Sequence, residues 1–307
     1  MICTCTMNPS LDYYMEFETP PKAGMTNRSQ LEYYEAGGKG INVSIVLSNL
    51  QIPTRATGFV GGFTRDFFIT LLQKYEYLQP NFTYINGHTR INVKLSDNEN
   101  ETDLNAAGPY ITSSDMENLM SKVVRLTEGD YFVLGGVCPE HLHDQTVEML
   151  VEGIEDGVRV VLDTNSSIIR DILPHHPFLI KTSEQELGEF RHIIMKRENV
   201  IEAVGELREK GAQNVIVLLD GAEEAVFGCE SGIYSCDILH DRRIVSTVGV
   251  GDSLTAGFLM NYLRSRDAVE SFRFACCCGI ATAYTKGFAT RDKIEKMYDQ
   301  TSVVRIG

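Results

Sequence analysis

The chain has 307 residues, 43% of them hydrophobic, which is enough to bury one large core. Its formal net charge of -14 excludes the broad basic surface that binds nucleic acid or anionic membranes. The N-terminus lacks a basic region followed by a long apolar run, and no later apolar run approaches the roughly 18 residues that span a bilayer. We therefore expect a cytoplasmic protein with no nucleic-acid or membrane partner, in which a few local cations and backbone amides hold any anionic ligand.

The cysteines and histidines do not show the spacing of a metal site. The eight cysteines are scattered without a C-x-x-C pair, and neighbouring residues on a helix point in different directions, so the run of three from Cys276 to Cys278 does not converge on one metal. His88, His175 and His176 have no acidic or cysteine partner at ligand spacing. We expect buried packing cysteines in a reducing compartment and ordinary loop histidines.

Two segments in the first third of the chain alternate polar and apolar residues. Residues from about 11 to 35 and from about 84 to 105 have the pattern of half-exposed antiparallel strands. The pattern predicts a small β-sheet that covers one edge of a larger domain as a lid, and ordinary hairpin decoration is an equally good interpretation. The aromatic residues of the first segment favour cross-strand packing or a lid-to-lid homodimer contact over nucleotide stacking. Because no linker interrupts the chain, we expect one domain over residues 1–307.

The first segment runs directly into a glycine cluster, "EAGGKGINVSIVLSNL" at 35–50, that precedes an amphipathic helix. Gly37, Gly38 and Gly40 leave the backbone open to a ligand, Lys39 supplies a cation, and the helix start supplies amide groups. The cluster matches neither the P-loop nor the dinucleotide fingerprint. It predicts an anion site, and the alternative is a flexible glycine turn before a helix.

Strands and helices then alternate through the middle of the chain. Short β-rich runs closed by turn residues predict strands at 55–62, 130–136, 158–165, 178–183 and 214–221. Helical spacing of apolar residues, with capping residues ahead and glycines behind, predicts helices at 113–126, 143–157 and 199–212. This alternation is typical of βαβ units and predicts a mainly parallel sheet with helices on both faces.

The stretch "STVGVGDSLTAGF" at 246–258 places an acid where the next helix begins. The consecutive amides of Gly249, Val250, Gly251 and Asp252 would wrap an anion, as backbone nests do. The alternative is that Asp252 is only an N-cap, which acids also favour. Since an N-cap does not need two neighbouring glycines, we favour the anion nest, and the absence of G-x-S-x-G excludes a hydrolase elbow.

Four fragments together resemble the PfkB, or ribokinase-like, carbohydrate kinases. They are "TMNPSLD", "GGKGINVS", "GHTRINVKL" and "TVGVGDSLTAGF", in the order and separation of that family along nearly the whole chain. "TRINVKL" followed by "ETDLNAAGP" looks most like the 1-phosphofructokinase branch, with tagatose-6-phosphate kinases next. The resemblance implies an α/β fold, a ribokinase-like αβα sandwich with a mainly parallel central sheet and a small β-sheet lid.

The resemblance also implies a role for each matching residue in an ATP- and Mg²⁺-dependent sugar-phosphate kinase. Asp252 matches the catalytic base, and the amides of Gly249, Val250 and Gly251 match the anion hole. Sugar-contacting positions correspond to Asp12, Gly38 and Asn42, and the groups that hold the substrate phosphate to Lys39 and Arg90. The nucleotide side corresponds to Lys181, Ser183, Glu186 and Gly221, where Glu186 would organise Mg²⁺ through water. The reaction so implied converts fructose 1-phosphate to fructose 1,6-bisphosphate.

Several positions depart from the family pattern. Val250 puts a β-branched side chain in the anion-binding turn, Glu140 replaces a glycine, and Ser183 replaces an asparagine of the magnesium network. Leu218 and Asp220 lie near where ATP would bind, and the added acid would repel phosphates. These departures keep a second hypothesis open, a weakly active or non-catalytic sugar-phosphate-binding protein, beside the kinase that the complete nest and base favour.

Overall fold

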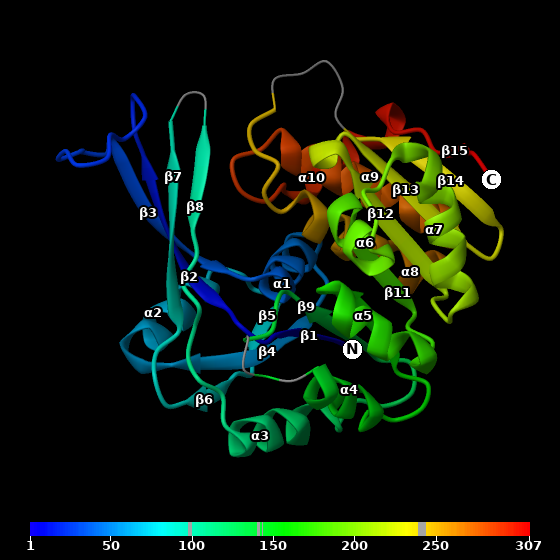
Figure 1. Ribbon diagram of the computed structural model, residues 1–307, viewed down its shortest axis with the longest axis horizontal. Helices are drawn as coiled ribbons and strands as arrows, with labels where there is room; N and C mark the ends of the chain where they lie inside the picture. The colour runs from blue at the N-terminus through cyan, green and yellow to red at the C-terminus, as the bar shows by residue number, and fades with distance from the viewer. Residues whose placement is uncertain (98–99, 140–141, 143, 239–243) are drawn as a thin grey trace.

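The computed structural model describes the chain except residues 98–99, 140–141, 143 and 239–243, and except the side chains of 144, 145 and 220. It contains two separate β-sheets (Figure 1). The large sheet has eleven strands in the order β15-β14-β13-β12-β11-β10-β9-β1-β4-β5, with β6 paired to β4. Its strands are β1 Ile2–Thr6, β4 Thr54–Gly61, β5 Leu78–Pro80, β6 Thr83–Ile85, β9 Tyr131–Gly135, β10 Arg159–Asp163, β11 Leu179–Ser183, β12 Asn214–Leu219, β13 Glu224–Cys229, β14 Gly232–Asp237 and β15 Val304–Arg305.

The large sheet is parallel over most of its width. Every pairing from β5 and β6 through β12 is parallel, and only β13, β14 and β15 run antiparallel at one edge. The five strands expected from β-rich runs are β4, β9, β10, β11 and β12, so the predicted mainly parallel sheet is confirmed. The hairpin of β13 and β14, which the sequence analysis did not predict, pairs in register from Glu224 opposite Asp237 to Cys229 opposite Gly232.

Helices cover both faces of the large sheet, as Figure 1 shows. One hydrophobic cluster packs α3 to α7 on one face, and a second packs α1, α8 and α9 on the other. The helices are α1 Lys39–Asn49, α2 Gly62–Leu72, α3 Ser113–Val123, α4 Asp144–Glu152, α5 Ser166–Ile172, α6 Glu184–Arg191, α7 Arg197–Glu209, α8 Val250–Ser265, α9 Ala268–Ala283 and α10 Arg291–Glu295, with short 3₁₀ turns η1 Leu173–His175, η2 Asp220–Ala222 and η3 Tyr298–Gln300.

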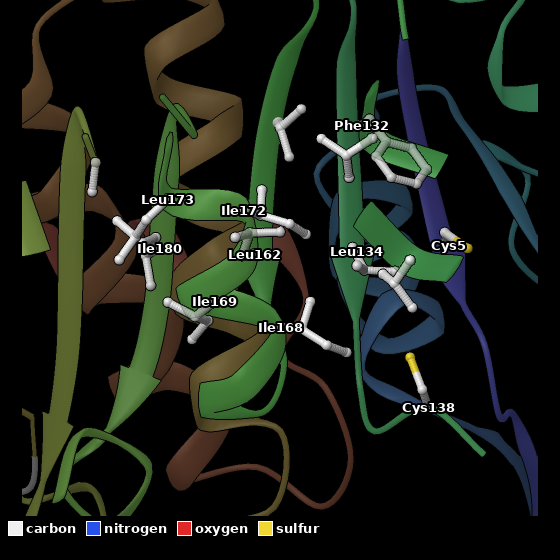
Figure 2. Packing of buried hydrophobic residues seen from close by; sticks show 14 of the residues in the cluster. Cys5, Phe132, Leu134, Cys138, Leu162, Ile168, Ile169, Ile172, Leu173 and Ile180 are labelled. Carbon is white, nitrogen blue, oxygen red and sulfur yellow. The ribbon is translucent and has the colours of Figure 1, made fainter. Parts of the chain in front are cut away.

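The strands alternate between these two clusters because successive side chains point to opposite faces. Figure 2 shows the cluster on one face, where Ile168, Ile169 and Ile172 of α5 lie near Leu134, Leu162 and Ile180 of neighbouring strands. The eight cysteines are all buried and free, so their predicted role as packing residues is confirmed. No described helix combines the length and hydrophobicity needed to cross a membrane.

The small sheet, here called the lid, comes from the two alternating segments. Its strands are β2 Ser10–Glu16, β3 Leu31–Gly37, β7 Arg90–Ser96 and β8 Glu101–Leu104, in the order β3-β2-β7-β8. Strand β2 pairs antiparallel with β3 and parallel with β7. Cross-strand tyrosines stack in two pairs, Tyr13 on Tyr34 at 4.5 Å and Tyr14 on Tyr33 at 4.7 Å between ring centroids. The predicted αβα sandwich with a separate small sheet is thus confirmed (Figure 1).

Candidate active site

Two helix N-termini meet at the carboxyl ends of β10 and β11. Asn42 of α1 donates from Nδ2 to Asp252 Oδ2 of α8 at 2.7 Å. Lys39 Nζ, at the start of α1, lies 2.8 Å from Asp163 Oδ1 at the end of β10. In parallel α/β sheets ligands bind in crevices at the carboxyl ends of the strands, so this junction is the candidate active site.

Helix α8 begins without a side-chain cap. Its N-cap is Gly249, which has a left-handed φ of 79°. A side chain there would meet the ring of Phe288 at 2.3 Å, so both the conformation and the close approach require glycine. Asp252 lies three residues further on, inside the first turn, and makes no capping bond. The alternative interpretation of Asp252 as an N-cap is therefore wrong.

Asp252 is a buried carboxylate, with only 7% of its surface exposed. Burial, followed by the negative charge of Asp163, raises its pKa from 3.8 to about 6. The cations Lys181 and Lys39 and the hydrogen bond from Asn42 oppose this rise. A carboxyl whose pKa lies this close to neutrality is ionised at pH 7 and still basic enough to accept a proton.

A cluster of lysines and acids surrounds Asp163, a residue that the sequence analysis missed. Lys181 Nζ lies 3.3 Å from Asp163 Oδ1, and Lys39 Nζ also reaches Glu186 Oε1 at 3.2 Å. Burial works against ionisation of Asp163, but the two ammonium groups outweigh it and hold the pKa of this carboxyl below its ordinary value. The signal in the sequence was an acid at the end of the predicted strand 158–165, the place where α/β sheets carry polar ligand-binding side chains.

The three amides expected to form an anion hole lie at the α8 N-terminus, and they differ in their nearest polar neighbours. The first four amides of a helix have no intrahelical acceptor, but Val250 N donates to Thr247 O at 3.3 Å. The β-branched side chain of Val250 is fully buried in the core cluster and lies beside Gly279 of α9, so it packs into the core. A side chain on Gly251 would lie 2.6 Å from Lys181 Nζ, which places an ammonium group directly beside this backbone.

A cavity of about 360 Å³ lies between the lid and the body of the protein. Asp12, Gly37 and Asn42 line it together with the inner face of the lid. Asp12 Oδ1 accepts from Ser10 Oγ at 2.7 Å and from Asn92 Nδ2 at 3.0 Å. Burial is the main cause of the raised pKa of Asp12. The structure thus brings Asp12 and Asn42, two expected sugar-contacting residues, to one cavity.

The remaining residues expected at the substrate are engaged with protein groups. Gly38 is the N-cap of α1 with a φ of 126°, and a side chain there would meet Thr6 at 2.5 Å. Arg90 donates to Ala106 O at 2.9 Å and Asn8 O at 3.0 Å, and its Nε has no partner among the described residues. Neither Arg90 nor Lys39 lines the cavity beside Asp12. The ammonium group of Lys39 is held instead by Asp163 and Glu186.

The residues expected on the nucleotide side start a helix next to the lysine cluster. Ser183 caps α6 through a reciprocal box, accepting from Glu186 N at 3.2 Å while its own amide donates to Glu186 Oε2 at 2.8 Å. Gly221 has a φ of 63° and open space where a side chain would project. Leu218 is half-buried on β12 near Gly251. Glu140 and the side chain of Asp220 lie outside the described residues.

One histidine has acidic neighbours that sequence spacing did not reveal. His175 Nε2 lies 3.6 Å from Glu148 Oε1, and Glu152, one turn further along α4, completes a group whose ligand atoms lie within 4.8 Å of one another. Tertiary packing joins η1 to α4, so this histidine has acidic neighbours in space although none lies at ligand spacing in the sequence.

Comparison with known proteins gives consistent matches over the whole chain. Residues 6–294 match the pfkB family carbohydrate kinase model. A 1-phosphofructokinase from Bacillus subtilis is 36% identical over 308 residues, covering 100% of both chains, and a D-tagatose-1-phosphate kinase from Bacillus licheniformis is 29% identical over 310 residues, again covering 100% of both. The solved structure of a phosphofructokinase candidate from Staphylococcus aureus superposes with a TM-score of 0.83 at 34% identity, covering 100% of this chain and 99% of the other.

The chain belongs to the pfkB family of carbohydrate kinases, as the four fragments indicated. Enzymes of this class are phosphotransferases with an alcohol group as acceptor, and this chain is a sugar-phosphate kinase of that family.

Proposed function

We propose that this kinase transfers the γ-phosphoryl group of ATP to fructose 1-phosphate and forms fructose 1,6-bisphosphate. The observation that carries the proposal is the buried Asp252, whose pKa is about 6 and whose carboxylate is oriented by Asn42 at the N-terminus of α8. The similarity to the Bacillus subtilis 1-phosphofructokinase supports this choice of substrate.

The proposed reaction is a direct displacement at phosphorus. Asn42 occupies Oδ2 of Asp252, which leaves Oδ1 to take the proton from the sugar hydroxyl. The hydroxyl oxygen forms a bond to the γ-phosphorus while the bond from that phosphorus to the bridging oxygen of ADP breaks. The amides of Gly249, Val250 and Gly251, with Lys181 beside Gly251, would stabilise the charge on the phosphoryl group in transfer.

The sugar phosphate would bind in the cavity under the lid. Asp12, Gly38 and Asn42 would contact sugar hydroxyls, because Asp12 and Asn42 present polar atoms there and Gly38 directly follows Gly37, which lines the cavity. Arg90 and Lys39 would hold the substrate phosphate after their side chains turned toward the cavity, which neither of them lines in this structure. Lys39 would then have to share its ammonium group between a phosphate and the carboxylates of Asp163 and Glu186.

The nucleotide would approach from the side of Lys181, Ser183, Glu186 and Gly221. The acids here fit Mg²⁺, since Asp163 Oδ2 is buried without a partner among the described residues and the Glu186 side chain keeps 23% of its surface exposed. When bound, the ion would neutralise charge on the donor phosphates. Glu186 would orient its water ligands, and the Ser183 cap would keep the Glu186 side chain in place.

The experiment that tests this proposal is a coupled ADP-release assay on the purified protein with Mg²⁺ and ATP. The substrates are fructose 1-phosphate, fructose 6-phosphate, tagatose 6-phosphate and tagatose 1-phosphate, the last because the Bacillus licheniformis relative is a D-tagatose-1-phosphate kinase. We expect the highest kcat/KM with fructose 1-phosphate. A preference for a tagatose phosphate would replace the substrate, and ADP release with none of the four would favour the sugar-phosphate-binding protein.

The outer face of the lid also supports the homodimer expected from the sequence. Tyr34 is 39% exposed and Leu104 is 54% exposed, and both alternate with cavity-lining residues on their strands. Pairing of two lids would bury this apolar face. Sedimentation equilibrium should therefore give a dimer that Tyr34→Glu dissociates, and a monomer for the unchanged chain would contradict the proposal.

A further inference from the structure

A lysine from the C-terminal part of the chain reaches across to the lid. Lys286, in the segment between α9 and α10, places Nζ 2.5 Å from Glu16 Oε1 at the end of β2. The same ammonium group lies 4.9 Å from the ring centroid of Tyr33 on β3. It therefore contacts two adjacent lid strands at once, through an ion pair and a cation–π contact.

This contact lies on the wall of the cavity assigned to the sugar phosphate. Glu16, Tyr33 and Lys286 line it together with Asp12 and Asn42. Tyr33 stacks on Tyr14, with ring planes only 2° from parallel. The ammonium group of Lys286 thus lies against an aromatic pair that belongs to the inner face of the lid, and a movement of the lid away from the body would break both of its contacts.

The segment that carries Lys286 contacts the start of α8 on both sides of this lysine. Phe288, two residues after Lys286, lies so close to Gly249 that a side chain there would come within 2.3 Å of the ring. Thr282, at the end of α9, shares a hydrogen bond of 2.9 Å with Ser253, the residue after Asp252. The backbone that carries Lys286 therefore has a fixed position relative to the turn that carries Asp252, the proposed base.

From these contacts we infer that Lys286 is a positioning residue, which holds the lid over the cavity at a fixed position relative to the α8 N-terminus. The inference rests on the proposed function for its kinetic consequence but not for the contact itself. Because the Lys286 side chain is 59% exposed, solvent screens the ion pair. Its loss together with that of the cation–π contact should shift the balance between closed and open lid about three- to tenfold. Electrostatic attraction of this kind weakens as salt is added.

A charge-swap cycle tests the contact directly. The variants are Lys286→Glu, Glu16→Lys and the double swap, which restores an ion pair of reversed polarity. Lys296→Glu is the matched control, since it makes the same charge change on an exposed residue that has no ion pair among the described residues. All eight native cysteines are buried, so labels can be attached selectively at Thr26→Cys, an exposed position between lid strands β2 and β3, and at Ile194→Cys on the body.

The distance distribution between these two labels reports lid position without any enzymatic activity. We expect both single variants to move population to longer distances and the control to match the unchanged protein. The double swap should recover part of the loss, because it restores the ion pair but not the cation–π contact with Tyr33. The same distances in Lys286→Glu as in the unchanged protein would overturn the inference. So would a double swap with distances no shorter than those of Lys286→Glu, since the ion pair would then not contribute.

Kinetics provide the second measurement. Lys286→Glu should raise KM for the sugar phosphate about three- to tenfold and increase ATP hydrolysis by water relative to sugar phosphorylation, because an open lid admits water. If the unchanged protein phosphorylates its sugar and the variant keeps the same KM and hydrolysis ratio, the inference fails while the proposed function stands. If the unchanged protein phosphorylates none of the sugars, the proposed function fails and the label distances still decide on the contact.

Discussion

Replacing Asp252 by asparagine is expected to lower turnover and to raise stability at the same time. The side chain keeps its size, and an asparagine carbonyl still accepts the hydrogen bond from Asn42. The variant cannot accept the proton of the sugar hydroxyl, so kcat should fall by about 10²- to 10⁴-fold, the usual contribution of a general base. Sugar-phosphate binding should survive, since the substitution removes a negative charge near the phosphates.

The stability change follows from the pKa of Asp252, which folding raises from 3.8 to about 6. A group whose pKa is raised in the folded state contributes stability that is complete below its unfolded pKa and is lost as pH rises through the folded pKa. At pH 8 the buried ionised carboxyl therefore destabilises the fold by roughly 3 kcal/mol. Asp252→Asn removes this destabilisation, so its free energy of unfolding should exceed that of the unchanged protein by roughly 3 kcal/mol at pH 8 and by about half as much at pH 5, and the two should converge only below the unfolded pKa of 3.8.

Urea unfolding between pH 5 and pH 8 and the ADP-release assay measure the two effects. Asp292→Asn is the control, because Asp292 is an exposed acid in the first turn of α10 and should change neither quantity. Turnover within tenfold of the unchanged protein would show that Asp252 is not the base. Equal stability at pH 8 would show that its carboxyl is not desolvated, and the raised pKa would have no basis.

Three further predictions follow from the same contacts. The value of kcat/KM should fall about tenfold for each pH unit below about 6, where Asp252 takes up a proton. Asp163→Asn should move this fall to lower pH, because the charge of Asp163 raises the pKa of Asp252. An unmoved pH–rate profile would show that Asp163 does not affect the pKa of Asp252. Gly40→Ala should lower the free energy of unfolding by about 1–3 kcal/mol, since its methyl group would lie 2.9 Å from a β1 carbonyl oxygen. Gly205→Ala on α7 meets nothing within 4 Å and should raise the free energy of unfolding by about 0.5–1 kcal/mol. Equal effects of the two variants in urea titrations would contradict the close packing at Gly40. Val250→Ala should destabilise the fold by about 2 kcal/mol yet keep ATP affinity within a few-fold by calorimetry, because that side chain is in the core; a large loss of affinity would place it in the anion turn instead.

Local patterning was enough to predict most of the large sheet and the lid strands. The runs at 130–136 and 158–165 became β9 and β10 because buried parallel strands are continuous β-branched and aliphatic segments. Alternation in residues 11–35 and 84–105 predicted half-exposed strands, because successive side chains of a strand point to opposite faces of the sheet. The antiparallel edge formed by β13 and β14 was not predicted, because their pairing depends on a neighbouring strand rather than on local pattern.

The candidate site divides in the same way. The sequence alone determined that glycines and an acid precede α8, that glycines and Lys39 precede α1, and that the chain belongs with the carbohydrate kinases. Which groups meet depends on tertiary packing, which joins Asp163 with Lys39 and Lys181, Asp252 with Asn42, Lys286 with Glu16 and Tyr33, and the Val250 side chain with the core. The physical reason is that a charge acts through space, so the pKa of Asp252 depends on burial and on residues 71 to 213 positions away, and neither is a property of local sequence.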